Sequence, residues 1–148
     1  MNTQTTQTTP TKQSELKHDW HLVDVEGQIL GRISTTIAKH LMGKAKSNFV
    51  RNLDCGDYVV VINASTVKVT GKKEENKVYA RHSGYPGGFR SETLKELRAR
   101  RPEEVIRHAV KGMLPDNRLR DKMLKRMFVF PGESHTYADK FAKKGEEK

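Results

Sequence analysis

The stretch Tyr58-Val59-Val60-Val61-Ile62 decides the fold, because it is a continuous apolar run dominated by β-branched side chains. Such side chains favour strands. A strand that is apolar at every position, with no polar alternation, is typical of a strand covered on both faces, as in a parallel sheet flanked by helices. We therefore expect this segment to be an inner strand of an α/β domain.

The segment before this run predicts a strand followed by a helix. Residues 20–25 are mostly apolar and end in a Glu-Gly-Gln turn. The period then changes to that of a helix, with one apolar stripe formed by Leu30, Ile33, Ile37 and Leu41. Gly43 is a natural end for this helix. Basic residues lie off the stripe or just beyond the helix: Arg32, Lys39, His40, Lys44 and Lys46.

The rest of the chain predicts short strands and a mostly helical carboxyl half. Further strands are expected at residues 67–69, 77–80 and 128–130, and helices at 94–100, 102–112 and about 117–127. Thr93 and Glu96 have the spacing of a capping box for the first of these helices, and Pro102 suits the first turn of the second. Because strands and helices alternate, the expected fold class is α/β, with helical cover on the sheet.

Length and composition predict a single soluble domain with loose ends. The chain has 148 residues, a hydrophobic fraction of 34% and a mean hydropathy of −0.77. Residues 1–18 are rich in Thr and Gln and are expected to be disordered. Residues 19–141 are expected to form one domain, and 142–148 a charged flexible tail. The single cysteine, the absence of a signal-peptide pattern and the absence of a long apolar run predict a cytoplasmic protein.

The charge predicts a polyanionic partner. Lys and Arg number 28 against 18 acidic residues, which gives a net charge of +10 and a pI near 9.8. Two clusters dominate, Arg81, Arg90, Lys95, Arg98, Arg100 and Arg101 in the first and Arg118, Arg120, Lys122, Lys125 and Arg126 in the second. A nucleic acid, an acidic membrane and a merely solvated surface all remain compatible with charge alone. Recurrence of the clusters beside loops and helix ends favours nucleic acid.

A glycine-rich loop follows the strand at 77–80 and strengthens the nucleic-acid interpretation. Gly84, Gly87 and Gly88 allow close approach of a backbone, and His82 and Tyr85 offer donors and a ring for stacking on unpaired bases. The loop lacks the Gly-Lys-Ser/Thr of a Walker loop and the spacing of a dinucleotide fingerprint. Taken alone, such a loop is more often a simple turn.

Enzymatic and metal sites are not predicted. Cys55 lies among Asp54 and Asp57, and carboxylates disfavour a reactive thiolate. The six histidines lack the spacing of a known zinc motif, and no Gly-x-Ser-x-Gly elbow is present. We therefore predict no catalytic residue, no metal and no cofactor.

Four motifs in order resemble the L-thirteen family of large-subunit ribosomal proteins, in its bacterial form. They are WHLVDVEGQILGRISTTIAKHLMG at 20–43, GDYVVVINASTVKVTGK at 56–72, HSGYPGG at 82–88 and RRPEEVIRHAVKGMLP at 100–115. The resemblance covers about residues 19–139. The family pattern has glycines near Asn117 and Arg120 and a second histidine at Tyr137, so the chain departs from it there.

The resemblance implies a three-layer α/β/α fold with a four-stranded, mostly parallel sheet and a basic helical extension at the carboxyl end. It implies a structural role in the large ribosomal subunit, binding to its ribosomal RNA and support of early subunit assembly, beside neighbouring ribosomal proteins. Together with the charge clusters it gives these expected RNA-binding residues: Arg32, Lys39, Lys44, Lys46, Lys72, Arg81, His82, Tyr85, Gly87, Gly88, Arg98, Arg100, Arg101, Lys111, Arg118, Arg120, Lys122, Lys125 and Arg126.

Two other functions stay open at this point. An RNA-binding regulator outside the ribosome, for example one that controls its own messenger, would use the same basic surface. An enzyme acting on a phosphorylated ligand through residues 84–88 is a more distant alternative, and it would need a convergent pocket. Neither a membrane nor a small-molecule substrate is expected.

Overall fold

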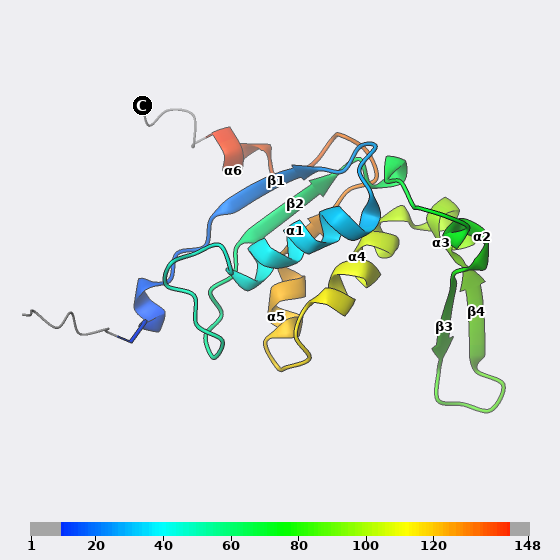
Figure 1. The fold of residues 1–148 in the computed structure, drawn as a ribbon, viewed down its shortest axis with the longest axis horizontal. Helices are drawn as coiled ribbons and strands as arrows, with labels where there is room; N and C mark the ends of the chain where they lie inside the picture. Colours follow the sequence, from blue (N-terminus) through cyan, green and yellow to red (C-terminus); the bar gives the residue numbers. More distant parts are fainter. Residues whose placement is uncertain (1–9, 143–148) are drawn as a thin grey trace, which may run out of the picture.

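The centre of the molecule is a three-stranded parallel sheet in the order β1-β2-β5 (Figure 1). This computed structural model describes residues 10–142. Strand β1 is Trp20–Asp24, β2 is Tyr58–Ile62 and β5 is Met127–Val129. Trp20 lies opposite Tyr58, and Val59 opposite Met127. Val59 through Ile62 are buried, so the prediction of an inner strand covered on both faces is confirmed.

Helices cover one face of this sheet. Helix α1 (Leu30–Met42) and helix α4 (Pro102–Met113) lie side by side across it (Figure 1). Helix α5 (Arg120–Lys125) packs against α1, α4 and β5, and helix α3 (Leu94–Arg100) packs against α4 toward the hairpin. Ile37 and Leu41 of α1 are fully buried in one apolar cluster with Val59 and Val61 of β2. The predicted helix ends are confirmed, with Gly43 left-handed at φ 76° and the Thr93–Glu96 capping box formed.

The opposite face of the sheet carries an aromatic cluster and one short helix. Because side chains alternate along a strand, Trp20 and Tyr58 point away from α1. The Trp20 ring stacks on Tyr58, with ring centroids 4.5 Å apart, and also contacts Tyr137. Phe141 of helix α6 (Ala138–Ala142) packs edge-on against Trp20. The cover on this side is therefore thin.

The expected four-stranded sheet is not confirmed, because the central sheet of the described residues has three strands. Lys68, in the expected strand at 67–69, makes only an isolated parallel bridge with Ile29. The remaining strands, β3 (Val78–His82) and β4 (Phe89–Thr93), form a separate antiparallel hairpin that projects from the domain (Figure 1). Helix α5 contacts α1, α4 and β5, so the basic helix belongs to the domain instead of extending from it.

The remaining described elements are short. They are the 3-10 turns η1 (Gln13–Glu15) and η2 (Ala64–Thr66) and the single-turn helix α2 (Lys73–Asn76). Residues 1–9, which are half of the first expected tail, and 143–148, which are nearly all of the second, lie outside the described residues. The domain limits at 19 and 141 therefore stay a prediction. No helix in the described part of the chain is long and apolar enough to cross a membrane.

Candidate nucleic-acid interface

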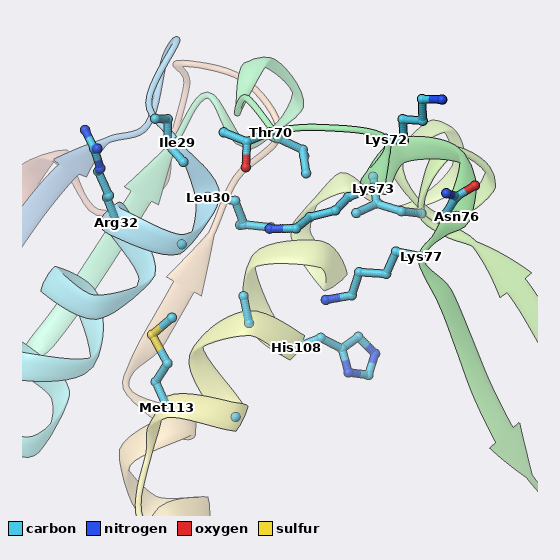
Figure 2. A pocket seen from close by; sticks show the side chains of 15 residues that line it. Ile29, Leu30, Arg32, Thr70, Lys72, Lys73, Asn76, Lys77, His108 and Met113 are labelled. Carbon is cyan, nitrogen blue, oxygen red and sulfur yellow. The ribbon is translucent and has the colours of Figure 1, made fainter.

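A cleft of about 900 Å³ opens between the amino end of α1, the segment around α2 and the carboxyl half of α4 (Figure 2). We term it the basic cleft, because its charged lining residues are all cations: Arg32, Lys72, Lys73 and Lys77. His108 of α4 also lines it, and no aspartate or glutamate among residues 10–142 does. The charged side chains of the cleft are thus all positive, and apolar residues such as Leu30, Val69 and Leu94 line the rest of it.

Backbone hydrogen bonds hold two walls of the basic cleft, the start of α1 and the segment before α2, in place. The Leu30 N–H donates to the Lys68 carbonyl at 2.9 Å, and the Lys68 N–H donates to the Gln28 carbonyl at 2.8 Å. These bonds tie the start of α1 to the segment that leads into α2. The first N–H groups of a helix carry partial positive charge, so the amino end of α1 adds to the positive potential of the basic cleft.

Two glycines keep the basic cleft open. Gly31 of α1 and Gly112 of α4 both line it, and a Cβ atom at either position would meet nothing within 4 Å. The floor between the two helices is therefore free of side chains at these points, and a phosphate or sugar can come close to the backbone.

The cations of the basic cleft are free to bind an anion. Within residues 10–142, none of the four forms an ion pair. Lys73 and Lys77 extend from the α2 segment into the space between α1 and α4, whereas Lys72 points outward (Figure 2). Lys77 also lies over the Tyr79 ring, with its Nζ 5.2 Å from the centroid. Nearby unpaired cations of this kind favour a polyanion.

Of these cations, Arg32 and Lys72 were expected from the sequence, and Lys73 and Lys77 were not. The signal that could have found them is the four-residue spacing of Lys73 and Lys77, which places two cations on one side of a helical turn. The turn itself was not predicted, because α2 has no apolar stripe.

The hairpin presents a second group of expected site residues. Arg81 lies directly opposite Arg90 across β3 and β4. Tyr85 at the tip is 76% exposed and Phe89 is 63% exposed. The loop is shaped by Gly84 and Gly87, which both have positive φ, and by bonds from the Gly84 N–H to His82 Nδ1 and from the Gly88 N–H to the Tyr85 carbonyl, each 2.9 Å. Exposed rings beside cations suit stacking on unpaired bases.

The hairpin tip does not enclose a small ligand. Residues 83–87 are all exposed and project from the domain (Figure 1). A phosphorylated substrate held only by this loop would stay in contact with water, which is unfavourable for catalysis. Cys55, the other candidate for chemistry, is buried, and its thiol faces the carbonyls of Asn48 and Val50 at 4.0 and 3.8 Å.

The other expected site residues are cations of two kinds. Some are exposed, and others form ion pairs or hydrogen bonds within the protein. The exposed ones are Lys39, Lys44, Arg100, Arg101, Lys111, Arg118, Lys122 and Lys125. Arg100 among these pairs with Glu92 at 2.6 Å. A pocket of about 390 Å³ gathers Arg81, Arg100 and Arg101 between the hairpin and α4. Glu92 and Glu104 also line this pocket, so its charge is mixed.

Four expected RNA-binding cations are held by the protein itself. Lys46 pairs with Asp57 and Arg126 with Asp54. Arg98 binds Glu74 at 2.9 Å and the Ser65 carbonyl at 3.0 Å, and it also donates to the Val67 carbonyl. Arg120 pairs with Asp116 at 2.8 Å. Each therefore has a structural role, and an RNA contact by these four stays a prediction.

Replacing Arg126 with methionine is expected to lower the free energy of unfolding by about 3 kcal/mol, because removal of one partner of a buried ion pair leaves the other uncompensated. The Arg126 residue is 8% exposed. The exposed Arg118 is the matched control, and its replacement by glutamine is expected to change stability by less than about 0.5 kcal/mol. Urea denaturation of both variants measures the difference. Equal stability of the two variants would show that Arg126 is not structural.

The cations of the basic cleft, beside a projecting hairpin with exposed rings, form a surface of the kind that suits a polyanion. A family model described as "Ribosomal protein L13" matches residues 18–136, and the chain belongs to this family. It is similar to proteins named "Large ribosomal subunit protein uL13" from three bacteria. The one from Dehalococcoides mccartyi (strain ATCC BAA-2266 / KCTC 15142 / 195) is 54% identical over 86% of this chain and 89% of the relative.

The other two relatives are similar over comparable lengths. The Thermosipho africanus protein is 50% identical over 88% of each chain. The Staphylococcus aureus protein is 47% identical over 89% of this chain and 91% of the relative. The resemblance to the L-thirteen family is thereby confirmed.

Proposed function

We propose that this protein is a structural, non-catalytic constituent of the large ribosomal subunit that binds the ribosomal RNA through the basic cleft and the β3–β4 hairpin. Membership of the L13 family and the names of the relatives support the ribosomal role. The observation that supports the RNA contact is the basic cleft, which in the described part of the chain is lined by four cations without an ion pair and by no acid.

The two surfaces suit different parts of a folded RNA. Lys73 and Lys77 reach into the cleft, where phosphates would displace counterions and gain affinity without base specificity. Tyr85 and Phe89 on the hairpin offer rings to unpaired bases, which folded RNA presents in loops and bulges. A surface of this kind holds two RNA segments in a fixed relative position, which suits a role in subunit assembly.

The proposal also covers the cellular location of the protein, its domain bounds and the residues that contact RNA. The protein acts in the cytoplasm within the large subunit, next to other ribosomal proteins, with residues 19–141 as its single domain. The exposed members of the expected site contribute to RNA contact, namely Arg32, Lys39, Lys44, Lys72, Arg81, His82, Tyr85, Gly87, Arg100, Arg101, Lys111, Arg118, Lys122 and Lys125. No small-molecule substrate is part of this function.

Sedimentation of a cell extract at low salt tests the proposal. The protein is expected to co-sediment with the large subunit, and to leave it as salt rises. Crosslinking in cells followed by sequencing of the bound RNA is expected to recover large-subunit ribosomal RNA. Recovery of messenger RNA alone, with the protein absent from large subunits, would favour an RNA-binding regulator and contradict the proposal.

A further inference from the structure

A cluster of three potential metal ligands lies at the end of the sheet where β1 and β2 begin and α1 ends. His21 is on β1, His40 is in the last turn of α1, and Asp57 directly precedes β2. One ligand atom from each residue lies within 4.8 Å of the other two. None of these residues lines the basic cleft.

The backbone brings the three side chains together. The Asp57 N–H donates to the His40 carbonyl at 3.0 Å, which ties the start of β2 to the end of α1. The His21 and His40 rings face each other, with centroids 4.3 Å apart and planes at 33°. His21 Nε2 lies 3.0 Å from Asp57 Oδ2. Two imidazoles and one carboxylate oxygen therefore lie close together at this end of the sheet.

The second oxygen of Asp57 is held by other groups. Its Oδ1 accepts from Lys46 Nζ and from the Asp19 N–H at 2.9 Å. Bonds of this kind orient the carboxylate and leave Oδ2 directed at the histidines, as the outer partners of a metal ligand do. Burial raises the pKa of Asp57, but the hydrogen bonds from Lys46, Asp19 and His21 outweigh it and hold the pKa below its ordinary value.

The surroundings favour a cation at this point. Helix α1 ends here, and the carboxyl end of a helix carries partial negative charge. Burial lowers the pKa of His40, and the neighbouring His21 lowers it further, against the opposing effect of Asp57. Metals bind the neutral form of imidazole. The single nearby opposing charge in the described hydrogen bonds is Lys46, which is already paired with Asp57.

We propose that His21, His40 and Asp57 Oδ2 form a binding site for a divalent transition-metal ion of the class that prefers imidazole, with Zn²⁺ as its representative. Imidazole nitrogens and a carboxylate oxygen bind Zn²⁺ at about 2.0–2.2 Å, and water takes the fourth position. The distance of 3.0 Å between His21 Nε2 and Asp57 Oδ2 suits neighbouring ligands, and the His40 side chain would have to move closer to both to complete the site.

Titration of the full-length protein with Zn²⁺, followed by calorimetry, tests this site. One ion per chain is expected to bind. His21→Gln and His40→Gln are each expected to weaken binding by tenfold or more, while the matched variants His108→Gln and His135→Gln leave it unchanged. Absence of binding to the unmodified protein, or equal weakening by His108→Gln, would overturn the proposal.

Nuclear magnetic resonance of the unmodified protein provides a second measurement that needs no variant. Addition of Zn²⁺ is expected to shift or broaden the ring signals of His21 and His40 first, at one equivalent. The signals of His82, His108 and His135 are expected to stay in place at that ratio. A first response at any of these three histidines would place the ion elsewhere and overturn the proposal.

Discussion

Replacing Gly56 with alanine is expected to lower the free energy of unfolding by about 3 kcal/mol or more, although only one methyl group is added. A Cβ atom at this position would overlap the carbonyl group of Leu41, and it would lie 3.0 Å from Arg126 Nη2. Overpacking of this kind costs about 1–3 kcal/mol, and more where backbone must move. Leu41 is fully buried, so the last turn of α1 has no room to shift.

The matched controls are Gly31→Ala and Gly112→Ala. Both glycines lie in helices without a positive φ, and an added Cβ would meet nothing within 4 Å. Alanine favours a helix over glycine by up to about 1 kcal/mol, so stability is expected to stay equal or rise. Urea denaturation of the three variants gives the comparison. Loss of the same size in Gly112→Ala and Gly56→Ala would show that the contact with Leu41 is not the cause.

Replacing Arg32, Lys73 and Lys77 together with glutamine is expected to weaken binding to large-subunit ribosomal RNA about 100-fold near 0.15 M salt. Each phosphate contact contributes about 0.7–0.9 to the slope of log affinity against log salt concentration. Loss of three contacts therefore flattens the slope by about two units. Filter binding over a range of salt concentrations measures both the affinity and the slope.

The control is a second triple variant that changes the net charge by the same amount at positions outside the basic cleft. Lys12, Lys17 and Lys140 are exposed and lie outside the basic cleft. Their joint replacement by glutamine is expected to flatten the slope by less than one unit, because they contribute only to the general field of the protein. If both triple variants had the same slope, the basic cleft would not be a specific contact.

Local patterns predicted the inner strand and the first helix. The run at 58–62 and the stripe of Leu30, Ile37 and Leu41 each specify their element within a few residues, and the structure confirms both. Strand β4 was missed because its sequence, Phe-Arg-Ser-Glu-Thr, has no apolar alternation. Its stability depends on pairing with β3. The sequence of one strand alone does not show such pairing.

The candidate site was harder to predict than the fold, because bonds between residues far apart in the sequence determine which cations are held inside the protein. Arg126 and Arg118 look alike in the sequence, but Arg126 is bonded to Asp54, which lies 72 positions away. The histidine cluster was not predicted for the same reason. His21, His40 and Asp57 have no motif spacing, and the fold alone brings them together. Charge in the sequence therefore predicts an RNA-binding surface better than it predicts which cations form it.

The strand order has a consequence for synthesis of the chain. Strand β2 ends at Ile62, but its second neighbour, β5, ends only at Val129. At 5–20 residues per second, translation of the intervening segment takes about 3–13 s. During that time one edge of the most apolar strand lacks its partner and is exposed to pairing with other chains. Nascent molecules of this protein therefore need protection until their last strand emerges.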